Sequence, residues 1–130
     1  MAGGAVILDT CALLWLATSD RMLSEVARAR IDAAPVVHVS AISGFEIGMK
    51  HREGKLSLPA TPSEWFEAIL EHHGLEVLAL DLPVCILSTQ LPLVHRDPCD
   101  RLIIATALAR RLPVVTGDVV FQQYDVEVIR

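Results

Sequence analysis

The chain has 130 residues, of which 52% are hydrophobic and 21% charged, and 11 Lys and Arg against 16 Asp and Glu give a net charge of −5. This length and composition predict one globular domain, residues 1–130, with a core of its own, and exclude a disordered chain. The acidic balance argues against a protein that coats nucleic acid through a general basic surface.

Apolar runs of strand length alternate with helix-like segments along the chain. The runs are short and rich in β-branched residues, as in strands buried on both faces. In chain order we expect strand 5–8, helices 13–17 and 24–31, strand 36–39, helices 42–52 and 61–73, strand 75–80, a helix that opens at Asp97 and runs to 112, and strands 113–116 and 126–129. Residues 83–91 fit a helix or a loop. This alternation predicts an α/β fold with a mostly parallel sheet between layers of helices.

The cysteines and apolar runs also bear on location. Cys11, Cys85 and Cys99 are odd in number and lie in apolar segments, so we expect buried free thiols of a reducing compartment. The runs 5–8 and 11–17 are too short to cross a bilayer, and no cationic stretch precedes them. The sequence therefore predicts a cytoplasmic protein without a membrane segment.

Two aspartates follow expected strands, where parallel sheets bind ligands. Asp9 comes directly after the first strand, and Asp118 comes two residues after Thr116, with Gly117 between them. The two carboxylates are expected to share a crevice if their strands are neighbours. For either aspartate alone, capping of the following helix is the simpler interpretation.

Glu46 lies among apolar residues of the expected helix 42–52. Ser43 and Glu46 match a capping box, but Ser40 directly follows a strand and is the better cap. Glu46 then lies in the second turn, where a buried carboxylate needs a partner. A functional role and a capping role both remain open.

Asp97 and Asp100 begin the helix that Pro98 opens, and the helix dipole alone explains both. Asp100 is also placed to face the crevice of Asp9. Several acids in one crevice raise one another's pKa, and a cation relieves that repulsion. Oxygen ligands favour Mg²⁺ or Mn²⁺ over zinc, since the His and Cys residues lack ligand spacing. His38 and His95 are interpreted as structural or surface residues.

Basic residues follow Glu46 and flank the helix start at Asp97. Composition alone favours solvated helix ends for them. The alternative is contact with the phosphates of a bound ligand, for which five of these residues are candidates: Lys50, Arg52, Lys55, Arg96 and Arg101.

The motifs occur in a specific order along the chain. Residues 8–10 (LDT), 40–47, 97–101 (DPCDR) and 116–118 (TGD) closely resemble the motifs of PIN-domain ribonucleases, in particular VapC-type toxins of toxin–antitoxin pairs. Residues 50–59 (KHREGKLSLP) resemble a further stretch of that subgroup. The likeness runs from about residue 5 to residue 129, nearly the whole chain.

The resemblance implies a PIN-like three-layer α/β/α fold of about five strands and metal-dependent hydrolysis of RNA with Mg²⁺, or Mn²⁺ as a substitute. It assigns Asp9, Glu46, Asp100 and Asp118 as the catalytic, metal-binding acids. It gives Thr10 and Thr116 supporting roles and leaves Asp97 at the edge of the site. Cys99 stands where the subgroup commonly has an aromatic residue, and Phe45 where Trp is frequent.

The resemblance also implies a homodimer and a small VapB-like antitoxin that occupies the active-site groove. We expect the apolar segment 13–16, with Trp65 and Phe66, to be partly exposed for such partners. A non-catalytic acidic-pocket module and a metal-dependent phosphatase of another α/β family are the alternatives. A phosphatase of the haloacid-dehalogenase kind needs a second Asp two residues after the first, where this chain has Cys11.

Overall fold

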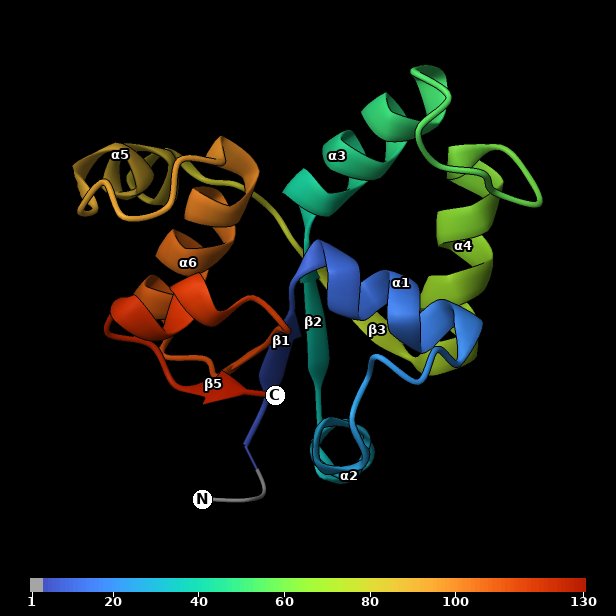
Figure 1. Cartoon of the computed structure of the whole chain (residues 1–130), viewed down its shortest axis with the longest axis horizontal. Helices are drawn as coiled ribbons and strands as arrows, with labels where there is room; N and C mark the ends of the chain where they lie inside the picture. Colours follow the sequence, from blue (N-terminus) through green and yellow to red (C-terminus); the bar gives the residue numbers. More distant parts are fainter. Residues whose placement is uncertain (1–3) are drawn as a thin grey trace.

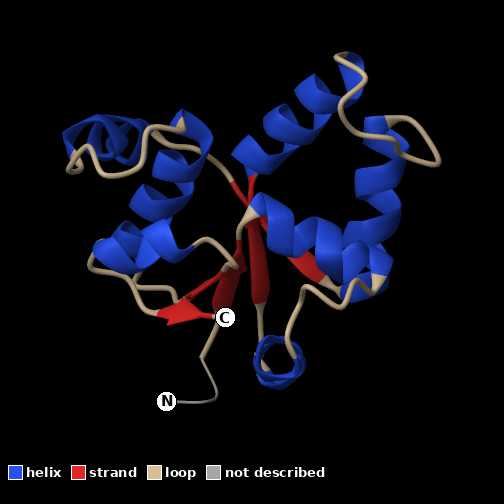
Figure 2. Ribbon diagram, in the orientation of Figure 1, coloured by secondary structure: helices blue, strands red, loops and turns tan. Residues whose placement is uncertain are grey.

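A five-stranded parallel sheet forms the centre of the computed structural model, which describes residues 4–130 (Figures 1 and 2). All four strand pairings are parallel, and the strands lie in the order β3-β2-β1-β4-β5. Their bounds are β1 Val6–Leu8, β2 Val37–Ser40, β3 Leu75–Leu78, β4 Val114–Val115 and β5 Val128–Ile129. The predicted α/β fold with five strands is confirmed.

Helices cover both faces of the sheet. They are α1 Thr10–Thr18, α2 Glu25–Ala33, α3 Ala41–Arg52, α4 Pro62–His73, α5 Leu82–Gln90 and α6 Pro98–Arg110, followed by the 3₁₀ helix η1 Val119–Gln123. The segment left open between helix and loop is therefore the helix α5. The 3₁₀ helix was not predicted, and α1 begins three residues earlier than expected because Asp9 caps it.

The alternation of side chains along β1 produces two cores, one on each face of the sheet. Val6 and Leu8 pack with α1, α2 and α4, whereas Ile7 packs with α5, α6 and η1. Figure 1 shows α5 and α6 on one side of the sheet and α1 and α4 on the other. All three residues of β1 are completely buried, which explains why this strand reads as a continuous apolar run.

The strand order determines where a ligand crevice can form. From β1 the chain continues to β2 and β3 on one side and then crosses to β4 and β5 on the other. The point between β1 and β4 is therefore a topological switch point, where open parallel sheets bind ligands beyond the carboxyl ends of their strands. Leu8 pairs with Val115 there, so the residues that follow them emerge side by side.

The exposed apolar surface differs from the expectation. Leu13 and Trp65 are buried in the core rather than exposed, and Trp15 and Phe66 are half-buried. The large apolar side chains most open to solvent lie elsewhere, in the turn before α2, on α2, α3 and α5, and in the loop that follows α5: Met22, Val26, Phe45, Leu82 and Leu93.

The cysteines are free thiols, as expected, but not all of them are buried. All three are free, with no disulfide within residues 4–130. Only Cys99 is buried, while Cys11 is exposed because it lies at the start of α1 beside the crevice. In the same part of the chain, no helix combines the length and apolar character needed to cross a membrane.

Arg101 stabilises the loop between α5 and α6. Its guanidinium donates to four backbone carbonyls, those of Ser88, Leu91, Pro92 and His95, at 2.7–3.1 Å. The side chain is buried. The prediction that Arg101 contacts RNA is therefore wrong, because its donors already bind the chain's own backbone.

We expect Arg101→Lys to lower the free energy of unfolding by about 2 kcal/mol or more, since an ammonium group cannot reproduce the fork of donors and leaves buried carbonyls unpaired. Urea denaturation measures this change. Arg110→Lys, at the exposed end of the same helix, is the matched control and should leave stability unchanged. Equal stability of the two variants would contradict the role given to Arg101.

Candidate metal centre

Asp9 joins three elements at the switch point. Its Oδ1 accepts a hydrogen bond from Ala12 N at 2.7 Å and so caps α1, while its Oδ2 accepts from the Thr116 hydroxyl after β4. Its own backbone N donates to the carbonyl of Val115 at 3.1 Å. The whole residue is only 4% exposed. The carboxylate is thus rigid and almost completely desolvated.

Glu46 reaches the same crevice from α3. Ser40 caps this helix by accepting from Ile42 N at 3.1 Å, so the capping-box interpretation of Glu46 is wrong. The Glu46 residue is 7% exposed, and its Oε2 lies 3.1 Å from Lys50 Nζ. Its Oε1 is buried and has no hydrogen-bond partner among the described residues.

The remaining predicted acids come from α6 and from the turn after β4. Asp97 caps α6 by accepting from Cys99 N at 2.9 Å, and Asp100 is half-buried in the first turn of the helix. Asp118 Oδ1 accepts from Val120 N at 2.9 Å and so caps η1. The capping interpretation therefore holds for Asp9, Asp97 and Asp118, and in each the second carboxylate oxygen is left for other partners.

These acids line one crevice of about 410 Å³, together with neutral and basic residues of α1, α3 and the turn after β4. Its lining residues are Asp9, Thr10, Cys11, Trp15, Met22, Glu46, Lys50, Asp97, Asp100, Gly117 and Asp118. The structure therefore brings together the four acids singled out from the sequence, and it adds Asp97 to them.

The two predicted supporting threonines contact other parts of the site. Thr116 donates its hydroxyl proton to Asp9 and accepts from Asp118 N at 3.0 Å, so it links two of the acids. Thr10 shares a hydrogen bond of 2.9 Å with the Ser43 hydroxyl of α3 and does not touch an acid directly. Thr10 thus fixes α1 against the helix that carries Glu46.

Gly117 is required by close packing beneath the crevice. A Cβ atom at this position would lie 2.7 Å from Trp15 Cη2, closer than real contacts allow. The missing side chain lets the turn after β4 approach α1. It thereby brings Asp118 toward Asp9.

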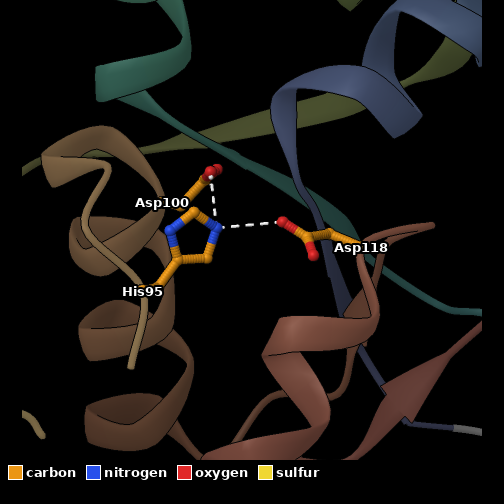
Figure 3. Close-up of side chains that lie close together, drawn as sticks. All are labelled: His95, Asp100 and Asp118. Atoms are coloured by element: carbon orange, nitrogen blue, oxygen red, sulfur yellow. Dashed lines mark hydrogen bonds and ion pairs between the residues drawn. The ribbon is translucent and has the colours of Figure 1, made fainter. Parts of the chain in front are cut away.

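His95 also reaches these acids, a contact that the sequence interpretation of a structural or surface residue did not include. Its Nε2 lies 2.9 Å from Asp118 Oδ2 and 3.1 Å from Asp100 Oδ2 (Figure 3). The three ligand-type atoms together form a group compact enough to surround one ion. The available signal was its place two residues before Asp97, at the start of the helix that carries Asp100.

The predicted RNA-contacting residues divide into three kinds. Lys50 lines the crevice and pairs with Glu46. Arg52, Lys55 and Arg96 are exposed but do not line it. Arg101 is buried, as described above.

Asp9 and Asp100 hold protons more strongly than ordinary carboxyls because their pKa values are raised. Burial raises the pKa of Asp9 to about 6, although the hydrogen bonds from Thr116 and Ala12 act in the opposite direction. Burial, and next the negative charge of Asp97, raise the pKa of Asp100 well above its usual range. A cation bound between these carboxylates would compensate the charges that burial and repulsion make costly.

The donor set fits a hard divalent cation. Carboxylate oxygens dominate the crevice, and Mg²⁺ and Mn²⁺ prefer such ligands. The unpartnered Glu46 Oε1 is the specific indication, since a buried carboxylate oxygen without a partner costs free energy that a bound cation would recover. Asp9, Glu46, Asp100 and Asp118 are the residues placed to hold it.

Comparison with known proteins identifies the family. The PIN-domain family profile matches residues 6–127. The chain belongs to the PIN-domain family. A relative of this PIN domain is Ribonuclease VapC22 of Mycobacterium tuberculosis, which is 30% identical over 114 residues, 87% of this chain and 86% of the relative.

Solved structures share the fold of this PIN domain at lower identity. VapBC2 from Rickettsia felis, bound to a DNA fragment from its promoter, superposes with a TM-score of 0.68 at 13% identity over 95% of this chain and 96% of the other. A toxin-antitoxin complex from Klebsiella pneumoniae gives a TM-score of 0.67 at 18% identity over 96% of each chain. These likenesses establish the three-layer architecture.

The raised pKa of Asp9 predicts how stability depends on pH in a chelator. Between about pH 4 and 6 the folded PIN domain keeps a proton that the unfolded chain has lost, so its free energy of unfolding falls as pH rises. Relative to Asp9→Asn, the wild type should lose on the order of 3 kcal/mol over this window.

Urea denaturation of both proteins from pH 4 to 8 measures this difference. Asp81→Asn is the matched control, because Asp81 caps α5 as Asp9 caps α1 but lies outside the crevice. It should follow the wild-type profile. Parallel profiles for the wild type and Asp9→Asn would contradict the desolvation of Asp9.

Proposed function

We propose that this chain is a metal-dependent endoribonuclease that hydrolyses RNA phosphodiester bonds in the cytoplasm, as the toxin of a toxin–antitoxin pair. Residues 1–130 act as a single PIN-like domain. Family membership and the name of the relative from Mycobacterium tuberculosis support the reaction class. The observation that carries the proposal is the buried, unpartnered Glu46 Oε1 in a crevice that Asp9, Asp100 and Asp118 also line.

The cofactor of this proposal is Mg²⁺, with Mn²⁺ as a substitute. When bound, such a cation polarises the scissile phosphate and lowers the pKa of a bound water. Asp9 needs no reorganisation to bind it, because both its oxygens are already fixed by Ala12 and Thr116. Glu46 offers a free oxygen on a helix whose start is fixed by Ser40.

Lys50 provides positive charge where a phosphate would enter. Its ammonium group lies 3.1 Å from Glu46 Oε2, and the side chain is 41% exposed and lines the crevice. A cation at Glu46 would free Lys50 to contact the RNA backbone. Three further basic side chains are exposed and would attract the RNA backbone at longer range: Arg52, Lys55 and Arg96.

We expect each of Asp9→Asn, Glu46→Gln, Asp100→Asn and Asp118→Asn to reduce Mg²⁺-dependent RNA cleavage by more than roughly 100-fold, since loss of a ligand costs more than loss of an outer partner. Cleavage should stop in excess chelator and return with Mg²⁺ or Mn²⁺. Gel assays on single-stranded RNA measure both effects.

Asp81→Asn again serves as the control, because it alters a helix cap outside the crevice and should cleave like the wild type. Circular dichroism checks that every variant is folded. Full activity of Asp9→Asn would contradict the assignment of the site. A wild type that binds RNA without cleaving it would favour the non-catalytic module instead.

The exposed apolar side chains support protein partners for this nuclease. Leu82 is 72% exposed and Leu93 82% exposed, and Phe45 and Met49 are open on α3. Burial of such side chains drives association. We infer a homodimer and a small VapB-like antitoxin that covers the crevice, in keeping with the toxin-antitoxin complex from Klebsiella pneumoniae among the structural neighbours.

The purified protein should be a dimer in light scattering at micromolar concentration. Co-expression with the product of the neighbouring small open reading frame should suppress both growth arrest and RNA cleavage. A monomer that the product leaves fully active would instead indicate a free-standing nuclease.

A further inference from the structure

Hydrogen bonds to the backbone and to both ring nitrogens of His95 fix its position. Its backbone N donates to the Tyr124 hydroxyl at 2.8 Å, and its carbonyl accepts from Arg101 at 3.1 Å. Its ring packs edge-on against Phe121, with centroids 5.7 Å apart, and its Nδ1 accepts from Asp97 N at 3.2 Å. The ring is therefore fixed with Nε2 toward the carboxylates of Asp100 and Asp118 (Figure 3).

The contact with Asp97 determines which ring nitrogen carries the proton. A backbone N–H only donates, so Nδ1 must present its lone pair to Asp97 N. The proton of the neutral ring then sits on Nε2. There it faces two acceptors at once, Asp118 Oδ2 at 2.9 Å and Asp100 Oδ2 at 3.1 Å.

We propose that His95 is a positioning residue that holds the carboxylates of Asp100 and Asp118 together as a shared hydrogen-bond donor, and that it is not itself a ligand of the cation. This inference rests on the proposed metal-dependent function. His95 lies in the loop between α5 and α6, whereas Asp100 belongs to α6 and Asp118 to the turn after β4. Its Nε2–H thus connects two separate elements at the spacing that the site needs.

Direct ligation by His95 is disfavoured by the same geometry. A ligand nitrogen needs a free lone pair, so the proton would have to move to Nδ1. The proton on Nδ1 would then point at the backbone N–H of Asp97. Two donors would face each other there, and the hydrogen bond would be lost. As a donor, by contrast, His95 leaves unused lone pairs of both carboxylates free for the cation.

Two substitutions separate the possible roles. The side-chain amide nitrogen of Gln can take the place of Nε2, whereas that of Asn is too short to reach it. We expect His95→Asn to weaken Mg²⁺ and Mn²⁺ binding by similar factors, roughly 10- to 100-fold, as loss of an outer partner does. We expect His95→Gln to keep wild-type affinity for both ions within about threefold, well inside that range.

Isothermal titration calorimetry without RNA gives both affinities, and urea denaturation confirms that the variants are folded. A loss of Mn²⁺ affinity much larger than that of Mg²⁺, in both variants, would identify a ligand and overturn the inference, because an imidazole nitrogen binds a transition-metal ion such as Mn²⁺ more strongly than it binds Mg²⁺. Unchanged affinities in His95→Asn would overturn it in favour of a purely structural role.

A second measurement is independent of RNA cleavage and of cation binding. The ¹⁵N chemical shifts of the His95 ring in chelator should show a protonated Nε2 and an unprotonated Nδ1, and the reverse would overturn the inference. A wild type that binds cations with this tautomer but leaves RNA intact would contradict the proposed function alone. A wild type that binds neither ion would overturn both.

Discussion

The hydrogen bonds of Asp9 are the constraint on which the rest of the site depends. One carboxylate oxygen caps α1 and the other accepts from Thr116, so the end of β1, the start of α1 and the end of β4 are joined at one side chain. The neighbouring strands β1 and β4 create the switch point, and Asp9 lies there at the end of β1. Because the group is buried, its charge is costly until a cation or a proton compensates it.

Helix starts position the other acids of the crevice as well. Asp97 and Asp118 are helix caps that also line the crevice, and Asp100 follows one turn after a cap. Each cap uses one carboxylate oxygen for the backbone and leaves the other for the site. The same residues thus begin helices and line the proposed cation site, and burial raises the pKa values of Asp9 and Asp100.

Much of this arrangement could be predicted from the sequence, because it follows from local rules. The run 5–8, the Ser40 cap and the Asp97-Pro98 helix start indicate their elements directly, and strand-end acids indicate the crevice. The contacts of His95 and Arg101 depend on the conformation of the loop between α5 and α6, which has no periodic pattern. Only the folded chain shows that Arg101 binds backbone carbonyls while His95, six residues earlier, faces two aspartates.

The central claim is that Asp9, Glu46, Asp100 and Asp118 form one divalent-cation centre. Anomalous diffraction from a crystal soaked in Mn²⁺ tests it most directly. We predict a peak in the crevice within about 2.2 Å of carboxylate oxygens, as expected for a hard cation bound to oxygen. The oxygens should include that of Glu46 which has no other partner. A crevice free of any peak at saturating Mn²⁺, or peaks confined to the outer surface, would contradict the account.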